Sequence, residues 1–407
     1  MQQAGPNPHE RHWPSHTTTT VPWRSTVRGP RADRETTAVR ASIPPTIARA
    51  VWTPDTDTAA LLDGAAVALR ELDAQHGTGL SALGGVLDRT EAVASSRIED
   101  EHATLDDVAR AAVGIRADPG ATAMVRAGGA IDGLVAAAGS GTITEASLLA
   151  AHRLLLRDDP VDGRYAGRYR DVQNWIGGGR SPRLARYVPP PPELVPGLMD
   201  DLFVFLHRDD LHPVAQAAIA HAQFESIHPF TDGNGRIGRA LMAAVLRRRG
   251  LARFVTVPVA TALVAERDRY FWHLERFRDG RLDDWVRDVA IAIGTVCDEA
   301  ALTALLLDEV AAERSAGPCA DGVHAVVGRA LVSDPVLTED RLDQLLHGER
   351  GTVDAVADDL CRAGVLRSVT ERRRDRAWVT IAAADELAAF GDRVQAAVRQ
   401  RANRVGW

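Results

Sequence analysis

The sequence has 407 residues and contains no lysine and only three cysteines. Arginine therefore carries all of the basic side-chain charge, and because Ala and Arg have GC-rich codons we attribute this bias to the genome. Cys297, Cys319 and Cys361 are scattered and form no CxxC pair. This pattern argues against a disulfide framework or a zinc site and favours a reducing compartment, so we expect a cytoplasmic protein.

The chain also lacks long apolar runs and a strong net charge. No uninterrupted stretch of about 18 apolar residues is present, and the first residues lack the apolar core of a signal peptide, so we expect no membrane contact. The formal net charge is -7 and the pI is near 6.0, so the protein as a whole is not expected to attract nucleic acid. Hydrophobic residues make up 45% and charged residues 25%, which is typical of a globular protein, and the length predicts two to four domains.

Four regions follow from the hydrophobic patterning. Residues 1–40 are polar and interrupted by proline, which predicts a disordered tail. Residues 41–135 have helical spacing and predict an N-terminal helical region. Residues 136–300 predict a second, mainly helical core, and residues 318–407 show three short helical segments followed by two strand-like runs, the order of a winged helix.

One non-helical stretch interrupts the helical core. Two short β-capable runs, at residues 172–176 and 185–188, are separated by glycine- and proline-rich turn residues. Four prolines at positions 189–192 end the second run. The sequence therefore predicts a mainly α fold that carries one β-hairpin and ends in a winged-helix-like domain.

The stretch "HPFTDGNGRIGR", residues 228–239, lies between two apolar helical patterns and so predicts a loop that enters a helix. The unpaired N–H groups at a helix start bind anions, and Gly233 and Gly235 let the backbone approach a phosphate closely. Arg236 and Arg239 lie one helical turn apart and can hold further phosphates. The loop is therefore a candidate binding site for the phosphates of a nucleoside triphosphate.

Two further side chains in this loop carry chemistry. Asp232 lies beside this binding site, and Mg²⁺ is commonly bound by one or two carboxylates together with substrate phosphates. His228 lies at the other end of the loop, and histidine is the side chain best suited to general-base work near neutral pH. The combination predicts a nucleotide-dependent transfer to a nucleophile that His228 deprotonates.

The motif HPF-x-D-G-N-G-R-x-x-R is similar to the signature of the Fic (filamentation induced by cAMP) family and matches it at every fixed position. The resemblance extends over about residues 42–295, including "RDVQNWIGGGR" and "RDRYFWHLERFRDG". It implies an all-α fold with a β-hairpin flap. It also implies a protein adenylyltransferase, which moves AMP from ATP to a Ser, Thr or Tyr hydroxyl and releases pyrophosphate.

The resemblance also implies a role for each motif residue. His228 would deprotonate the target hydroxyl, Phe230 would anchor the loop, and Asp232 would bind the magnesium ion that bridges the α- and β-phosphates. The remaining residues would hold ATP: Gly233, Asn234 and Gly235 as the anion cradle, Arg236 at the β-phosphate, Arg239 at the γ-phosphate and Tyr270 at the nucleoside, unless Tyr270 is a core residue. Glycine at position 235, where related kinases carry lysine, favours AMP transfer.

A second motif, "SSRIED" at residues 95–100, resembles the inhibitory motif of the same family. Ser95 and Glu99 are four residues apart and so share one face of a helix. The resemblance implies that Glu99 pairs with Arg239 and leaves ATP in a non-productive pose. Asp100 stands where Gly or Asn is expected, and an extra carboxylate there can alter the hydrogen bonding of Glu99. The alternative is an ordinary charged helix surface.

The hairpin and the C-terminal region have two interpretations each. The hairpin can align a target strand, with Ile176 and Tyr187 as candidate clamps, or it can be merely structural. In the winged-helix-like region "ERRRDR", residues 371–376, is a candidate basic wing for DNA. Asp354, Asp358 and Asp359 on the expected recognition helix would repel phosphates, so we favour a protein-interaction or dimer role.

The leading hypothesis is an autoinhibited, magnesium-dependent adenylyltransferase that acts on hydroxyl side chains of a protein. One alternative is a DNA-binding regulator whose Fic domain modifies the protein itself. Another is a Fic enzyme that transfers UMP or a different phosphate-linked group, because nothing in the sequence reads the base. The resemblance further suggests a homodimer.

Overall fold

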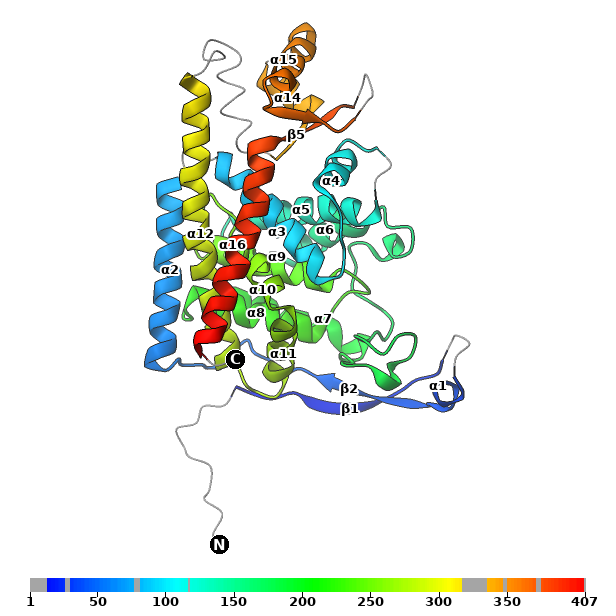
Figure 1. The fold of residues 1–407 in the computed structure, drawn as a ribbon. Helices are drawn as coiled ribbons and strands as arrows, with labels where there is room; N and C mark the ends of the chain where they lie inside the picture. The colour runs from blue at the N-terminus through cyan, green and yellow to red at the C-terminus, as the bar shows by residue number, and fades with distance from the viewer. Residues whose placement is uncertain are drawn as a thin grey trace.

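The computed structural model describes residues 13–25, 30–76, 81–115, 118–316, 335–346, 350–370 and 375–405. Within these ranges the body of the molecule is helical, as predicted (Figure 1). Its α-helices are α2 (Thr56–His76), α3 (Ser81–Ile98), α4 (Leu105–Ala112), α5 (Pro119–Ala138), α6 (Glu145–Leu156), α7 (Val195–Leu206), α8 (Pro213–Ile227), α9 (Asn234–Arg248), α10 (Val259–Ala265), α11 (Arg267–Arg278) and α12 (Asp283–Ala316). Three short 3₁₀ turns lie between α6 and α7: η1 (Gly163–Tyr165), η2 (Pro182–Leu184) and η3 (Pro192–Leu194).

Helices α8 and α9 lie at the centre of this body (Figure 1). Every residue of α8 from Val214 to Ile227 is buried, and α8 packs against α7, α9, α11 and α12. A helix that is buried on all sides must be surrounded by other elements, so α8 is a rigid support. The loop of residues 228–233 joins α8 to α9, and the candidate site is therefore built on the most enclosed pair of helices.

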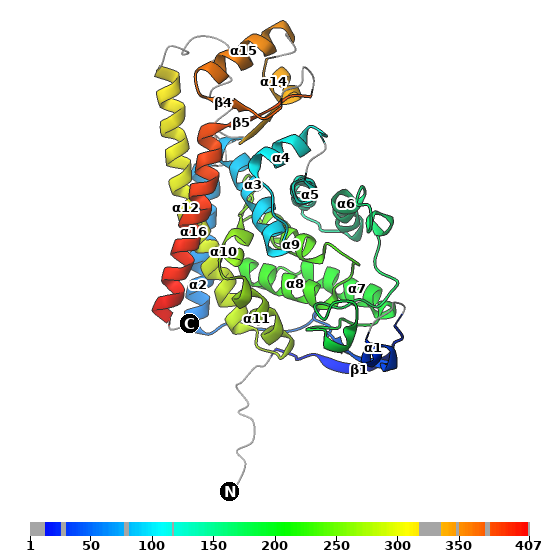
Figure 2. The ribbon, with the colours of Figure 1, turned by 45° about the vertical axis from the view of Figure 1, so that its right-hand side comes forward.

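Three long helices, α2, α12 and α16 (Ile381–Val405), run side by side along one flank, and the two views agree on this (Figure 2). Segment 283–313 of α12 is apolar and long enough to cross a membrane by length and composition, but 56% of that apolar window is buried inside the protein. Packing of α12 against α2, α8 and α16 accounts for much of its apolar surface.

The C-terminal region only partly follows the prediction. It contains β3 (Val336–Thr338), α14 (Glu339–Leu345), α15 (Arg350–Arg362), β4 (Leu366–Ser368) and β5 (Ala377–Thr380), with an antiparallel sheet in the order β3-β5-β4. The first expected helix and wing residues 371–374 lie outside the described residues, so the winged helix stays a prediction. Helix α16 differs from the prediction of a winged-helix-like domain over residues 318–407, because its residues Ala383, Phe390 and Val394 pack into the main core.

The predicted disorder of residues 1–40 is wrong for the described residues 13–25 and 30–40, which contain regular structure. Strands β1 (Thr17–Pro22) and β2 (Ala38–Ile43) pair antiparallel, with Thr17 opposite Ile43, and α1 (Arg31–Glu35) lies between them along the chain. The ribbon runs along the base of the molecule (Figure 1). It is stabilised by contacts that are distant in the sequence: Ser42 N donates to Val188 O at 2.8 Å, and Ala41 is fully buried.

The expected hairpin is also reduced. Between residues 172 and 188 the structure has one isolated β-bridge, Ile176 to Tyr187, in place of two strands. Consecutive Gly177, Gly178 and Gly179 all have positive φ, which turns the chain immediately after the bridge. The segment is therefore a tight loop with one point of strand pairing.

Candidate functional site

The loop between α8 and α9 has the backbone of a tight turn. His228 ends α8 in the left-handed region, with φ 50° and ψ 60°, and its N–H donates to Phe224 O at 2.8 Å. Gly233 precedes α9 with φ 80°, and a Cβ atom there would lie 2.7 Å from Leu155 Cδ2. Both the conformation and the space require glycine at 233, so the sequence specifies where α9 begins.

Phe230 and Asn234 hold this loop rigid. The Phe230 ring is fully buried and stacks on His152, with ring centroids 3.7 Å apart. The Asn234 side chain accepts from Phe230 N and donates to Phe230 O, both at 2.9 Å. Asn234 thus acts inside the loop as a brace, in addition to its predicted place in the anion cradle.

Two residues that the sequence reasoning missed fix the loop from outside. His152 Nδ1 accepts from Gly167 N at 2.9 Å, and its Nε2–H donates to Asp232 O at 3.1 Å. Burial lowers the pKa of His152 to about 4, so the ring is neutral and keeps these roles. Its only sequence signal was a polar residue on the apolar face of α6.

Arg170 is the second missed residue, and it ties the loop to the segment after the reduced hairpin. The side chain is buried, Nε donates to His228 O at 2.8 Å and Nη2 donates to Pro190 O at 2.5 Å. Burial lowers the pKa of Arg170 to about 10, which still leaves the guanidinium charged at neutral pH. A displacement of residues 189–190 would therefore be transmitted to the backbone of His228.

The predicted phosphate-binding residues other than Arg239 line one cavity of about 500 Å³. The N-terminal turn of α9 forms its floor, and Arg236 Nη2 pairs with Asp232 Oδ2 at 2.8 Å. Its wall also includes Arg186, Arg267 and Arg278, which sequence reasoning did not assign to the site. The predicted site residues that line this cavity are Glu99, Ile176, Tyr187, His228, Asp232, Gly233, Asn234, Gly235, Arg236 and Tyr270.

Arg239 lies behind the cavity floor and is 2% exposed. Its Nε donates to Ser95 Oγ, and its Nη2 donates both to Ser95 O and to Glu99 Oε1, all at 2.8 Å. A Cβ atom on Gly235 would overlap the Glu99 carboxylate. That carboxylate therefore rests against the first turn of α9, where the positive end of the helix attracts an anion.

The backbone conformation of Asp100 explains why Gly or Asn is expected at this position. Its φ is 63°, in the left-handed region that glycine, asparagine and aspartate adopt more readily than other residues. Its carboxylate turns away from Glu99 to Arg267, whose Nη2 donates to Asp100 Oδ2 at 2.8 Å while Nε donates to Ile98 O at 2.8 Å. Asp100 thus ends α3 in the required geometry and adds a link to α11.

Tyr187 and Tyr270, the two tyrosines predicted to contact the target and the nucleoside, are more buried than expected. Tyr187 is 6% exposed, its hydroxyl donates to Ser226 O at 2.6 Å and the Arg278 guanidinium covers its ring at 3.5 Å. Its side chain is therefore committed to the core, and of the two candidate clamps only the half-buried Ile176 side chain is accessible. Tyr270 is 2% exposed, its hydroxyl is hydrogen-bonded to His221 Nε2 at 2.9 Å, and the residue forms part of the cavity wall.

The Asp232 carboxylate suits a cation that takes most of its other ligands from a nucleotide. The Asp232 side chain keeps 49% of its surface exposed beside the phosphate cradle. In the part of the chain that the structure describes, no three His, Cys, Asp or Glu side chains form a cluster that could hold a metal by themselves. One carboxylate beside a phosphate cradle is the arrangement in which Mg²⁺ binds between protein and substrate.

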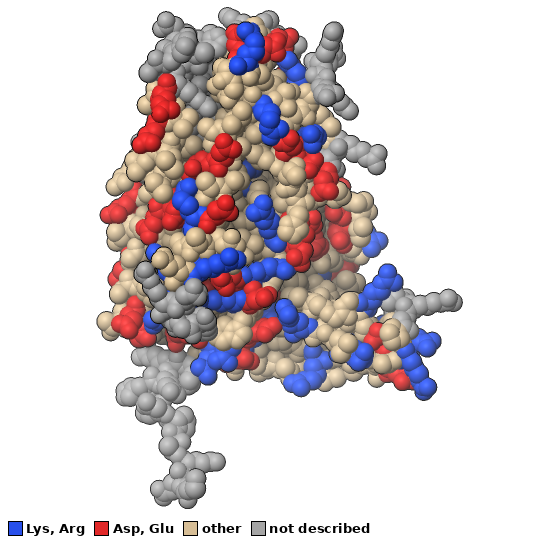
Figure 3. Space-filling view, in the orientation of Figure 1, with Lys and Arg blue, Asp and Glu red and all other residues tan. Residues whose placement is uncertain are grey.

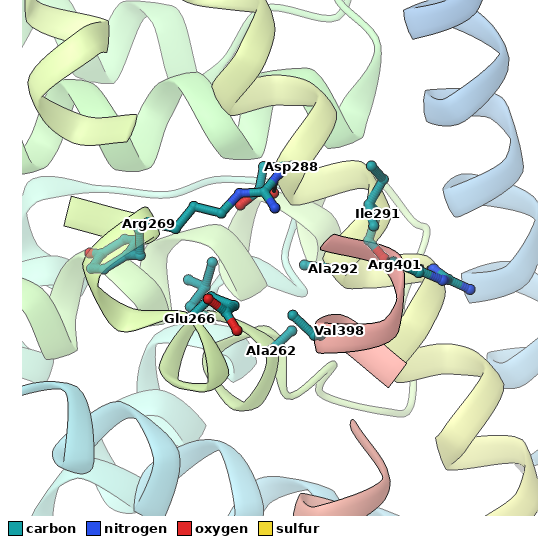
Figure 4. Close-up of a pocket in the computed structure, with 10 residues that line it drawn as sticks. Ala262, Glu266, Arg269, Asp288, Ile291, Ala292, Val398 and Arg401 are labelled. Carbon is teal, nitrogen blue, oxygen red and sulfur yellow. Dashed lines mark hydrogen bonds and ion pairs between the residues drawn. The ribbon is translucent and has the colours of Figure 1, made fainter. Parts of the chain in front are cut away.

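A smaller cavity of about 40 Å³ lies between α10, α11, α12 and α16 (Figure 4). Arg269 and Asp288 point toward one another across it and pair at 2.6 Å. These two side chains thus engage each other, and the volume of the cavity is too small for a nucleotide. We therefore place nucleotide chemistry in the larger cavity.

Basic and acidic side chains are interspersed over the face shown in Figure 3. In the C-terminal region Arg376, the last residue of the expected basic wing, pairs with Glu339 at 3.2 Å and also with Asp354. Neutralisation of this arginine removes one phosphate contact that a DNA-binding wing would use.

A helical fold in which an HPFTDGNGRIGR loop and a paired glutamate meet at one cavity defines a Fic-type domain. Residues 142–246 match the Fic/DOC family, so this part of the chain is a Fic domain. It is similar to the protein adenylyltransferase Fic of Drosophila virilis, with 35% identity over 152 residues, which cover 36% of this chain and 28% of that protein. The protein adenylyltransferase Fic of Culex quinquefasciatus is 34% identical over 152 residues, covering 36% of this chain and 27% of that protein.

The fold is shared with a solved structure of a Fic family protein from Desulfovibrio desulfuricans. The TM-score is 0.51 at 23% sequence identity, and the match covers 81% of this chain and 97% of that chain. The predicted Fic-type helical fold is confirmed. The chain aligns with little more than a quarter of the length of these curated relatives.

Proposed function

We propose that this protein is a magnesium-dependent protein adenylyltransferase, which transfers AMP from ATP to a Ser, Thr or Tyr hydroxyl and is held in check by Glu99. The observation that carries the proposal is the loop of residues 228–239. It presents His228, Asp232 and Arg236 to one cavity of about 500 Å³, with the helix start of α9 as its floor. The similarity to the protein adenylyltransferases Fic of Drosophila virilis and Culex quinquefasciatus supports the same activity.

The residues of α9 bind and orient the triphosphate. The first residues of α9 line the cavity. The N–H groups at a helix start have no partner within the helix, and a preformed array of such donors holds an anion without reorganisation. Arg236 is anchored by Asp232 and would hold the β-phosphate. Arg239 would hold the γ-phosphate once its guanidinium is released from Glu99, and planar bidentate donors suit this contact.

His228 would receive the proton of the target hydroxyl. The side chain is 15% exposed and lines the cavity, while its backbone carbonyl is fixed by Arg170 and its N–H by Phe224. The hydroxyl oxygen then attacks the α-phosphorus, the bond to the β-phosphate breaks and pyrophosphate leaves. Asp232 would hold the magnesium ion, which when bound would offset the charge of the phosphates.

Glu99 supports autoinhibition because its carboxylate competes with ATP for two groups. It engages Arg239 at 2.8 Å and rests against Gly235 in the phosphate cradle. Both places are suited to phosphate oxygens, so a productive triphosphate and the docked carboxylate exclude one another. Arg267 adds a second restraint, because it holds both the last turn of α3 and Asp100.

The test is incubation of wild-type and Glu99→Gly protein with each of the four nucleoside triphosphates, Mg²⁺ and cell lysate, followed by intact-mass measurement. We expect a gain of one AMP with ATP and a higher yield in Glu99→Gly, with His228→Ala as the inactive control. A UMP adduct would favour the alternative donor. Absence of any adduct on Glu99→Gly or lysate proteins would overturn the proposal.

For the C-terminal region we propose contact with a protein, such as a second copy of the chain, in preference to DNA. The pairing of Arg376 with Glu339 and Asp354 supports this assignment. A salt-dependent shift of duplex DNA by the full chain would reverse it and would favour the DNA-binding regulator with self-modification.

A further inference from the structure

A buried carboxylate that the proposed mechanism does not use lies directly behind His228. Glu225 belongs to α8, one turn before His228, and its side chain is 7% exposed. Its Oε2 lies 3.7 Å from His228 Nδ1. Buried carboxylates are rare unless they have a partner, so the position of Glu225 needs an explanation.

The surroundings make Glu225 an anion. Burial by itself would raise the pKa of Glu225, but contact with His228 and attraction to His221 and Arg239 outweigh it and lower the pKa below its usual value. Gly238 on α9 makes room for the carboxylate, because a Cβ there would lie 2.9 Å from Glu225 Oε1. The loop motif thus includes a glycine whose space is used by Glu225.

The two nitrogens of His228 have different surroundings. Nδ1 is buried and has no hydrogen-bond partner within the described ranges, and neither has Oε1 of Glu225. The ring as a whole keeps 15% of its side-chain surface and lines the cavity. Nδ1 is thus turned to the carboxylate, and Nε2 is the nitrogen that can meet a substrate.

A separation of 3.7 Å is longer than a hydrogen bond, but catalytic contacts in ligand-free structures are often long and tighten when substrate binds. We propose that Glu225 is a positioning residue whose carboxylate accepts the Nδ1 proton of His228, so that Nε2 is the free base that faces the target hydroxyl. During transfer the hydroxyl proton ends on Nε2, and Glu225 stays ionised and stabilises the resulting imidazolium, the arrangement of a carboxylate–histidine pair.

This assignment rests on the proposed function but has a readout of its own. We would record long-range ¹H–¹⁵N NMR spectra of the full chain with ¹⁵N-histidine, at a pH where the rings are neutral, and identify the His228 signals by their loss in His228→Ala. We expect the Nδ1–H tautomer in the wild type. An Nε2–H tautomer would overturn the inference whether or not the protein transfers AMP.

The second arm is kinetic and uses Glu99→Gly as the background. Glu225→Gln removes the charge but keeps the shape, and we expect kcat to fall roughly 10- to 100-fold with KM for ATP changed less than about 2-fold. Glu386→Gln is the matched control, a buried carboxylate on α16 that pairs with Arg393 and Thr303, and it should leave kcat unchanged. Unaltered kcat in Glu225→Gln would refute the inference.

The two arms separate the failures. If Glu99→Gly transfers no AMP, the proposed function fails, and the tautomer of wild-type His228 still decides the role of Glu225. If Glu225→Gln does not fold, which its melting temperature would reveal, the wild-type spectrum again decides. Transfer that proceeds with Nε2–H on His228 would leave the proposed function standing and remove this inference alone.

Discussion

Replacement of Glu99 tests the contact between α3 and the phosphate cradle. Glu99 follows Ile98, the last residue of α3, so glycine at this position costs little helix stability. Glu99→Gly removes both the ion pair with Arg239 and the obstruction beside Gly235. Glu99→Gln removes only the charge. We therefore expect the rate of AMP transfer to rise in the order wild type, Glu99→Gln, Glu99→Gly.

The magnitude follows from the burial of the two partners. A hydrogen bond to a charged group contributes about 1.5 to 3 kcal/mol, and about 1.4 kcal/mol corresponds to a tenfold change. Arg239 is 2% exposed but Glu99 is 35% exposed, so solvent screening places the pair at the lower end of that range. We expect an activation of about 10-fold for Glu99→Gly and about 3- to 5-fold for Glu99→Gln.

The assay is the initial rate of labelled AMP incorporation at an ATP concentration below KM. Glu275→Gln is the matched control, because Glu275 is a second carboxylate of the same cavity and pairs with Arg186 at 3.7 Å. Equal rates for wild type and Glu99→Gly would refute the argument. Activation of Glu275→Gln to the same extent would show that removal of any negative charge suffices.

Three further outcomes follow from the loop and from α3. Asn234→Ala leaves the buried Phe230 N–H without its acceptor, so the free energy of unfolding measured with urea should fall by about 1 to 3 kcal/mol. Asp232→Ala should lower kcat about 100-fold or more and abolish stimulation of transfer by added Mg²⁺, while the melting temperature stays near that of the wild type. Burial raises the pKa of Glu91 to about 8 from an ordinary 4.5, so its stabilising effect is present at low pH and lost as pH rises toward about 8. The free energy of unfolding should therefore decline by a few kcal/mol between about pH 4.5 and pH 8, and Glu91→Gln should make this decline smaller.

Local sequence was sufficient where the chain itself carries the constraint. Gly233 requires a left-handed backbone and Thr144 caps α6, so the start of each of these helices could be predicted from residue type. Hydrophobic patterning likewise predicted two apolar helices, α8 and α9, joined by a polar loop. Ser95 on α3 and Glu99, directly after the last residue of α3, both bind Arg239, as their spacing indicates.

Sequence reasoning failed where stability comes from distant contacts. Residues 17–22 and 38–43 are polar and β-branched, and their ribbon depends on the contact of Ser42 with Val188. Helix α16 has an apolar face, but its place against α12 and α10 required knowledge of the fold. The hairpin of residues 172–188 was predicted from β-capable residues, yet its backbone makes one bridge because turn residues and prolines dominate the segment.

The sequence by itself determined which reactive side chains residues 228–239 bring together, because a histidine, a carboxylate, glycines and arginines lie within one loop whose geometry is local. Only the tertiary structure decided how that chemistry is supported and restrained. His152 and Arg170 hold the loop through hydrogen bonds that no spacing reveals, since three-dimensional contacts do not follow distance along the chain. The same holds for Glu99, whose carboxylate reaches Arg239 only because α3 is packed beside α9.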